Sequence, residues 1–279
     1  MEKHVSFRRW RIGLDQEKTN LGKENTEKRI TKQKIIWGRL IDLVKDEIRL
    51  DDLNRILDVG GERTSIFLSL RNGEKTAVDP LFDQIFLSEP DLKGIDEYKD
   101  VNFISCSIEE LASEKQYDTI FMLMVLNHLG ELNEIPEKID SLLAPSGTLI
   151  IVVECYADPV VRNIMKFFDV LSYHPHHFLV NDVINIFPRY KLLKKQQIWQ
   201  IYSDFPLENS NNKKIRFYRI DLIAARVWNF SAQFGKRNPI FVAKVTLCFA
   251  LAFTTAFLRH REDPVRPIDK PWLFVFKNL

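Results

Sequence analysis

Cysteine is scarce in this sequence, and so is any excess of charge. The three cysteines, Cys106, Cys155 and Cys248, lie far apart and form neither a C-x-x-C pair nor a disulfide framework. We therefore expect a reducing, cytoplasmic environment. The charged N-terminal segment lacks the apolar core that a signal peptide requires. With 40 basic and 38 acidic residues, the formal net charge of +2 gives no general reason to expect nucleic acid as a partner.

Glycine is missing where a nucleotide-binding loop would need it. A dinucleotide-binding loop follows the pattern G-x-G-x-x-G, which places the pyrophosphate at a helix N-terminus. In the stretch RILDVGGERTS, Glu62 follows Gly60 and Gly61, where it would put a negative charge beside a phosphate. A P-loop is excluded because no G-K-[ST] follows. The loop therefore favours an adenosine ligand without phosphates.

Short apolar runs alternate with helical patterns over much of the chain. The runs are RILDV, TAVDP, VNFISC, YDTIFMLMVL and GTLIIVVE. Runs that are apolar on both faces and separated by crossover segments favour a parallel sheet covered by helices on both sides. We therefore predict an α/β fold with a doubly wound, mostly parallel sheet.

Polar residues follow four of these runs. Because ligands bind beyond the carboxyl ends of the strands in such sheets, we expect these residues to lie at one edge. Asp79 follows Asp58 by one strand and one crossover, a separation that suits a carboxylate accepting both hydroxyls of a ribose. The residues at this edge are Asp58, Gly60, Gly61, Asp79, Ser107, Ile108, Glu109, Asn127 and His128.

The order of these motifs resembles that of class I S-adenosylmethionine-dependent methyltransferases. ILDVGGE resembles the first motif, E/D-x-G-x-G, and TAVDP the acidic second motif; CSIEELA, YDTIFMLMVLNHL and LLAPSGTLIIV resemble the later motifs. The similarity covers roughly residues 56–153 and resumes at HPHHF. It implies a Rossmann-like fold with an antiparallel final strand and S-adenosylmethionine as the cofactor.

The resemblance also implies a role for each residue at this edge. Asp58 would act through the loop and the amino acid end of the cofactor, and Gly60 would let the backbone pass close to it. Asp79 would hold the ribose diol, and Ser107 the adenine edge. The remaining cofactor-binding candidates are Gly61, Pro80, Ile108, Leu123 and Asn127.

Three of these residues also have a purely structural interpretation. Asp58 could cap a helix, and Asp79 could be a turn residue before Pro80. Ser107 could open a capping box completed by Glu110.

Methyl transfer needs an in-line approach and, for an oxygen or a protonated nitrogen acceptor, a base. Three histidines are candidates: His128 at the end of the fourth strand, and His174 and His177 in YHPHHF. A metal site is not expected there, because Pro175 disfavours helix at His174 and the rings would not share one face. A capping or packing role for these rings is the alternative.

We therefore predict S-adenosylmethionine-dependent methyl transfer to an oxygen or nitrogen of a small molecule, a glycan or a lipid-linked acceptor. One alternative is a cofactor-binding subunit without catalytic activity. A nucleic-acid methyltransferase is a weaker alternative, because no N-P-P-Y motif or RNA-binding module is present.

We expect four regions along the chain: a basic arm and helix in 1–50, the methyltransferase core in 51–203, a mainly helical insertion in 204–268, and a final core strand in 269–279. The apolar stretch 239–258 carries one charged residue, Lys244. It is long enough to raise the question of a membrane. We expect a buried or lid helix; an interfacial helix contacting a membrane surface and a true span are the alternatives.

Overall fold

The structure is a computed structural model that describes residues 15, 26–51, 54–112, 114–167, 174–203 and 269–278. The predicted helical insertion 204–268 lies outside the described residues, as do the apolar stretch 239–258 and nearly all of the basic arm before residue 26. Within the described ranges, no helix has the length and apolar content needed to cross a membrane.

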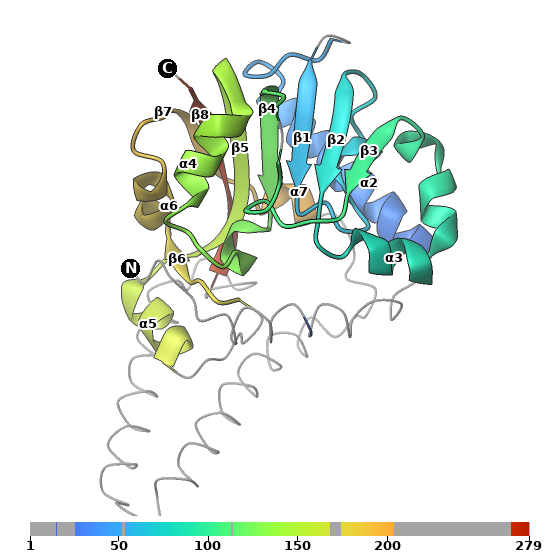
Figure 1. The fold of residues 1–279 in the computed structure, drawn as a ribbon. Coiled ribbons are helices and arrows are strands. Elements are labelled where there is room, and N and C mark those ends of the chain that lie inside the picture. The colour runs from blue at the N-terminus through green and yellow to red at the C-terminus, as the bar shows by residue number, and fades with distance from the viewer. Residues whose placement is uncertain are drawn as a thin grey trace, which may run out of the picture.

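One mixed sheet forms the centre of the fold, in the order β3-β2-β1-β4-β5-β8-β7 (Figure 1). Strands β1 to β5 run parallel, and β8 runs antiparallel to both of its neighbours. This is the α/β Rossmann-like arrangement with an antiparallel final strand that the sequence predicts. The strands are β1 (Arg55–Val59), β2 (Glu74–Val78), β3 (Val101–Ile104), β4 (Tyr117–Leu123), β5 (Leu143–Tyr156), β6 (Phe178–Leu179, paired with the end of β5), β7 (Lys191–Gln197) and β8 (Asp269–Lys277).

Strand β8 comes from the C-terminal end of the described chain and inserts between β5 and β7. Phe274 pairs with Ile151 of β5 and with Lys195 of β7. Successive side chains from Leu273 to Phe276 are fully buried, so both faces of this strand contact core. A strand that is buried on both faces has apolar residues at successive positions of its sequence. That burial is the reason for the apolar sequence WLFVFK.

Helices cover both faces of the sheet, as the alternation of patterns predicts (Figure 1). On one face, α4 and α6 pack with Leu57 and Val59 of β1; on the other, α2 packs with Ile56. Successive residues of β1 thus contact hydrophobic clusters on opposite faces of the sheet, so each face is covered. The helices are α2 (Thr26–Val44), α3 (Phe82–Ser88), α4 (Ile135–Leu142), α5 (Pro159–Phe167), α6 (Val180–Ile186) and α7 (Gln200–Ser203), with short 3₁₀ turns η1 (Ile66–Leu68), η2 (Pro90–Gly94), η3 (Asp96–Tyr98) and η4 (Leu126–His128).

The carboxyl ends of β1, β2 and β4 meet at one edge, where the strand order reverses between β1 and β4. Backbone hydrogen bonds continue beyond these strand ends: Gly60 donates to Val78 at 2.8 Å, and Met124 donates to Val152 at 2.6 Å. The loops after the strands are therefore held in register with the sheet. A crevice at such a reversal is the usual ligand site of this architecture.

Candidate functional site

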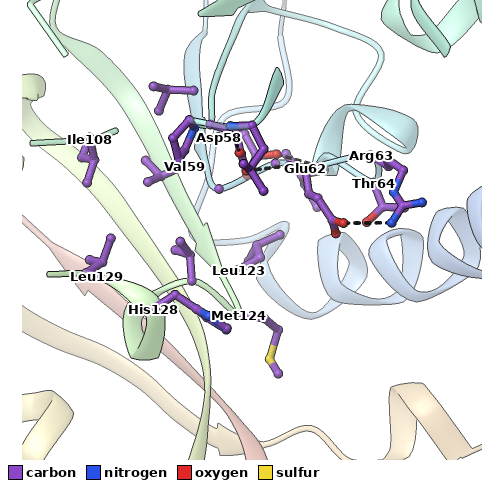
Figure 2. A pocket seen from close by; sticks show the side chains of 18 of the residues that line it. Asp58, Val59, Glu62, Arg63, Thr64, Ile108, Leu123, Met124, His128 and Leu129 are labelled. Atoms are coloured by element: carbon purple, nitrogen blue, oxygen red, sulfur yellow. Dashed lines mark hydrogen bonds and ion pairs between the residues drawn. The ribbon is translucent and has the colours of Figure 1, made fainter. Parts of the chain in front are cut away.

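A cavity of about 480 Å³ opens at this edge of the sheet, bounded by the loops after β1, β2, β3 and β4 and by α2 (Figure 2). In Figure 2, Glu62, Arg63 and Thr64 lie on one side of it and Ile108 and Leu129 on the other. The structure brings most of the predicted site residues together in this cavity. Those lining it are Asp58, Gly60, Gly61, Asp79, Pro80, Ser107, Ile108, Leu123, His128 and His174.

Asp58 supports the loop from below. Its Oδ2 accepts hydrogen bonds from Ser65 Oγ at 2.5 Å and from the backbone N–H of Ile66 at 3.0 Å. Ile66 begins the 3₁₀ turn η1, so Asp58 satisfies a helix N-terminus while also lining the cavity. Burial raises the pKa of Asp58 to about 7, although the bonds from Ser65 and Ile66 favour the charged form.

The loop after β1 needs glycine at its first position. Gly60 has φ +74°, and a Cβ there would lie 2.5 Å from Cγ2 of Val125. Glu62 also has a positive φ, +44°. Its backbone adopts the left-handed conformation that glycine provides most easily. The loop therefore keeps a glycine-type shape although Glu62 stands where the family motif has glycine.

Asp79 joins two loops. Its Oδ2 accepts from the backbone N–H of Glu62 at 3.0 Å, and its Oδ1 accepts from that of Leu81 at 2.8 Å. The second bond is the turn role considered for Asp79 before Pro80. Because each carboxylate oxygen has further lone pairs, these bonds leave acceptor capacity for a diol in the cavity.

Ser107 and Ile108 border the cavity after β3. The carboxylate of Glu110 accepts from both the backbone N–H and the Oγ of Ser107, each at 3.3 Å. Glu110 thus reaches back as it would in a capping box, but residues 108–110 form a turn rather than a helix. The buried side chain of Ile108 gives this side of the cavity an apolar wall suited to an adenine ring.

Helix α2 contributes cavity residues that the sequence did not single out. Arg29, Gln33 and Trp37 line the cavity, and Trp37 Nε1 donates to the carbonyl of Thr64 at 2.6 Å. Arg29 pairs with Glu62 across the loop at 2.6 Å. No local motif marks these three residues as part of a site. Their spacing of four residues, which places them on one face of a helix, is the one sequence signal that could have indicated a shared role.

The imidazole rings of His128 and His174 meet in the cavity after β4, with ring centroids 4.7 Å apart. The segment carrying His174 is fixed by His176, whose backbone N–H donates to the carbonyl of Asn127 at 3.3 Å and whose Nε2 lies 2.8 Å from that of Leu129. Two predicted site residues are not among the described residues that line the cavity. These are Asn127, whose side chain is buried below the rim, and His177, whose Nδ1 lies 3.0 Å from the hydroxyl of Tyr156.

No group of three or more histidine, cysteine, aspartate or glutamate side chains within the described ranges could hold a metal ion. The three histidines of HPHH point to different partners instead. His174 packs against His128, His176 contacts Leu129, and His177 contacts Tyr156.

The sequence and the fold are similar to those of known proteins. The sequence pattern described as a methyltransferase domain matches residues 31–229. The ubiquinone biosynthesis O-methyltransferase of Rickettsia bellii is 30% identical over 120 residues, which are 40% of this chain and 47% of that protein. The chain thus spans about half the length of the curated relatives it matches.

Two solved structures share the fold at low sequence identity. A putative sarcosine dimethylglycine methyltransferase from Galdieria sulphuraria has a TM-score of 0.53 and 12% identity, over 86% of this chain and 84% of that one. The [4+2]-cyclase SpnF has a TM-score of 0.52 and 14% identity, over 86% of this chain and 81% of that one. At these identities the likeness concerns the fold alone.

Proposed function

The chain belongs to the methyltransferase domain family, as a class I S-adenosylmethionine-dependent member, and we propose that it transfers a methyl group from this cofactor to a hydroxyl oxygen of a small molecule. The observation that carries the proposal is the shared cavity. The carboxylates of Asp58 and Asp79 and the imidazoles of His128 and His174 all line it. The first two suit the cofactor, and the last two suit an acceptor that must lose a proton.

We assign the cofactor to the loops after β1, β2 and β3. Asp79, already fixed by two backbone N–H groups, would accept the ribose hydroxyls. Ile108 would cover the adenine, and Gly60, where an added Cβ would lie 2.5 Å from Val125, would keep the loop in the shape that admits the cofactor. S-adenosylmethionine supplies an electrophilic methyl group on a sulfonium, so the protein needs only to orient it and to activate the acceptor.

We assign the acceptor to the part of the cavity after β4. The described lining residues from this loop and from the segment before β6 include no carboxylate. An uncompensated cationic amine would be costly in such a place, whereas a hydroxyl could donate to an imidazole. These residues are Met124, Val125, His128, Leu129, His174 and Pro175. The similarity to an O-methyltransferase supports the same acceptor class.

The proposed step is a single displacement. An imidazole nitrogen of His128 would take the hydroxyl proton while the acceptor oxygen bonds to the methyl carbon. The bond between that carbon and sulfur would break with its electron pair left on sulfur, which would give S-adenosylhomocysteine as the second product. General base catalysis of this kind contributes about 10²-fold or more to such a step.

A cofactor-binding protein without catalytic activity is the second candidate, because Glu62 and Ser146 replace glycines of the family motifs. The backbone conformation at these two positions argues against a loss of the loop shape. Glu62 has φ +44° and Ser146 has φ +58°, so both positions keep the left-handed conformation. A lipid-linked acceptor would involve the apolar stretch 239–258, which lies outside the described residues.

An acceptor panel tests the proposal. Purified protein is incubated with S-adenosylmethionine and, separately, with phenols, aliphatic alcohols and primary amines, while release of S-adenosylhomocysteine is measured. We expect turnover with at least one hydroxyl class and none with the amines. Turnover confined to amines would overturn the assignment of the acceptor, and binding of cofactor without turnover on any acceptor class would favour the second candidate.

A further inference from the structure

Glu62 carries a carboxylate into the cavity that the proposed methyl transfer does not use. Its Oε2 lies 2.6 Å from Arg29 Nη2, and its Oε1 lies 3.3 Å from Arg63 Nη2. The side chains of Glu62 and Arg29 are 32% and 27% exposed, so a ligand in the cavity can reach both. Figure 2 shows Glu62 and Arg63 together on the side of the cavity opposite Ile108.

Several backbone groups of this loop already bond to the protein, so its side chains are the main groups that can recognise a charged ligand. The N–H of Glu62 donates to Asp79, the carbonyl of Arg63 accepts from the hydroxyl of Tyr98 at 3.0 Å, and the carbonyl of Thr64 accepts from Trp37. A loop held at three successive residues cannot easily move to offer these groups to a ligand.

Arg63 is the buried member of a charged cluster that also contains Arg29, Glu62 and Glu89. Its side chain is 1% exposed, and its Nη1 pairs with Glu89 at 3.0 Å. Its Nε is buried and has no hydrogen-bond partner among the described residues. An unsatisfied N–H on a buried guanidinium is costly, so an acceptor arriving from the cavity would be favoured.

The charges in this cluster balance. Glu62 and Glu89 carry two negative charges, and Arg29 and Arg63 carry two positive charges. A free phosphate would meet the Glu62 carboxylate, whereas a zwitterion can place its ammonium on Glu62 and its carboxylate on the guanidinium groups. Both contacts would be charge-assisted hydrogen bonds.

We propose that Glu62, Arg29 and Arg63 recognise the amino acid end of the cofactor: Glu62 binds its ammonium group, and Arg29 with Arg63 binds its carboxylate. The inference rests on the proposed function, because it assumes that the cofactor occupies this cavity. It assigns a binding role to the residue that replaces the motif glycine. Glu62 and Arg29 pair with each other across the loop.

Two ligands that differ only at this end provide the test. S-adenosylhomocysteine has the amino acid end, and 5′-methylthioadenosine has the same adenosine and sulfur without it. Binding of each is measured by calorimetry for the wild type and for Glu62→Gln. We expect Glu62→Gln to weaken S-adenosylhomocysteine binding about tenfold or more, and to change 5′-methylthioadenosine binding by less than about twofold.

The controls remove comparable ion pairs far from the cavity. Glu74→Gln breaks the exposed pair with Lys115 and should leave both affinities unchanged. Arg29→Gln tests the positive side of the cluster, with Arg49→Gln, at the exposed pair with Asp51, as its control. If Glu62→Gln does not fold, Arg29→Gln still decides the question, because Arg29 lies on the surface of α2.

Equal changes for the two ligands would overturn the inference, because Glu62 would then only shape the loop. Unchanged binding of S-adenosylhomocysteine in both Glu62→Gln and Arg29→Gln would also overturn it. A wild-type protein that binds neither ligand would overturn the proposed function itself. That result is distinguishable from the other two, since in them the wild type binds at least one ligand.

Discussion

The rings of His128 and His174 pack edge to face with an interplanar angle of 87°, although the two residues are far apart in the sequence. His128 ends the 3₁₀ turn after β4, and His174 lies in the segment that His176 fastens to the same loop. The sheet therefore positions His128, and the loop after β4 positions His174 through its contacts with His176. This pairing puts two proton-accepting groups beside the proposed path of the methyl group.

Replacing His128 by alanine should lower kcat by about a hundredfold and leave cofactor affinity nearly unchanged, because the ring acts on the acceptor alone. His128→Gln should be comparably slow, since an amide keeps polarity without accepting the proton. Steady-state kinetics and calorimetry on the same preparations check both values. Full activity in both variants would contradict a base at this position.

The same experiment on His177 separates catalysis from packing. His177 is buried and contacts the Tyr156 hydroxyl. We expect His177→Phe to lower the free energy of unfolding by about 1 kcal/mol through loss of that hydrogen bond, with a smaller effect on kcat than His128→Ala has. A hundredfold loss of kcat with unchanged stability would instead return His177 to the list of bases.

Asp58 should make stability depend on pH in the opposite direction to an ion-paired aspartate. Burial raises its folded-state pKa from 3.8 to about 7. Between these values the folded chain binds a proton that the unfolded chain has lost, so stability falls as pH rises from about 4 to 7 and stays low above that. The loss amounts to at most about 4 kcal/mol.

Asp58→Asn is the matched test, because an amide oxygen can accept the same bonds from Ser65 and Ile66 without ionising. We expect urea unfolding of the wild type to show a smaller free energy of unfolding at pH 8 than at pH 5.5, and a flatter profile for Asp58→Asn. Parallel profiles in the two proteins would assign the pH dependence to other groups.

Gly60→Ala should disrupt the loop. The new Cβ would lie 2.5 Å from Val125, and φ +74° is a strained conformation for alanine. We expect a loss of stability of about 1 to 3 kcal/mol and weakened cofactor binding. Gly38→Ala in α2 is the control, because nothing lies within 4 Å of its added Cβ and alanine favours helix. Similar thermal stability of the two variants would contradict this account of the loop.

The sequence predicts the sheet well because buried strands carry continuous apolar runs, and even the C-terminal run WLFVFK identifies the antiparallel strand. The site is predicted less completely. Residues at strand ends follow from topology, so Asp58, Asp79 and His128 come together as expected. Arg29 and Trp37 were missed because their part in the cavity depends on how α2 packs across the loop.

The roles of the histidines are another part of the site that the sequence does not predict. Within HPHH, nothing in the sequence distinguishes the ring that enters the cavity from those that hold the segment in place. His174 lines the cavity, whereas His176 and His177 make hydrogen-bond contacts with Leu129 and Tyr156. The position of each ring depends on the bend at Pro175 and on the tertiary contacts that His176 and His177 make.

Calorimetric titration with S-adenosylhomocysteine, comparing the wild type with Asp79→Ala, tests the central claim most directly. Asp83→Ala, an exposed aspartate on α3, serves as the control. We predict one site per chain in the wild type and in the control, and an affinity about a hundredfold lower in Asp79→Ala, equivalent to about 2 to 3 kcal/mol. Absence of binding to the wild type at millimolar ligand, or equal affinity in Asp79→Ala, would contradict the assignment of this cavity to the cofactor.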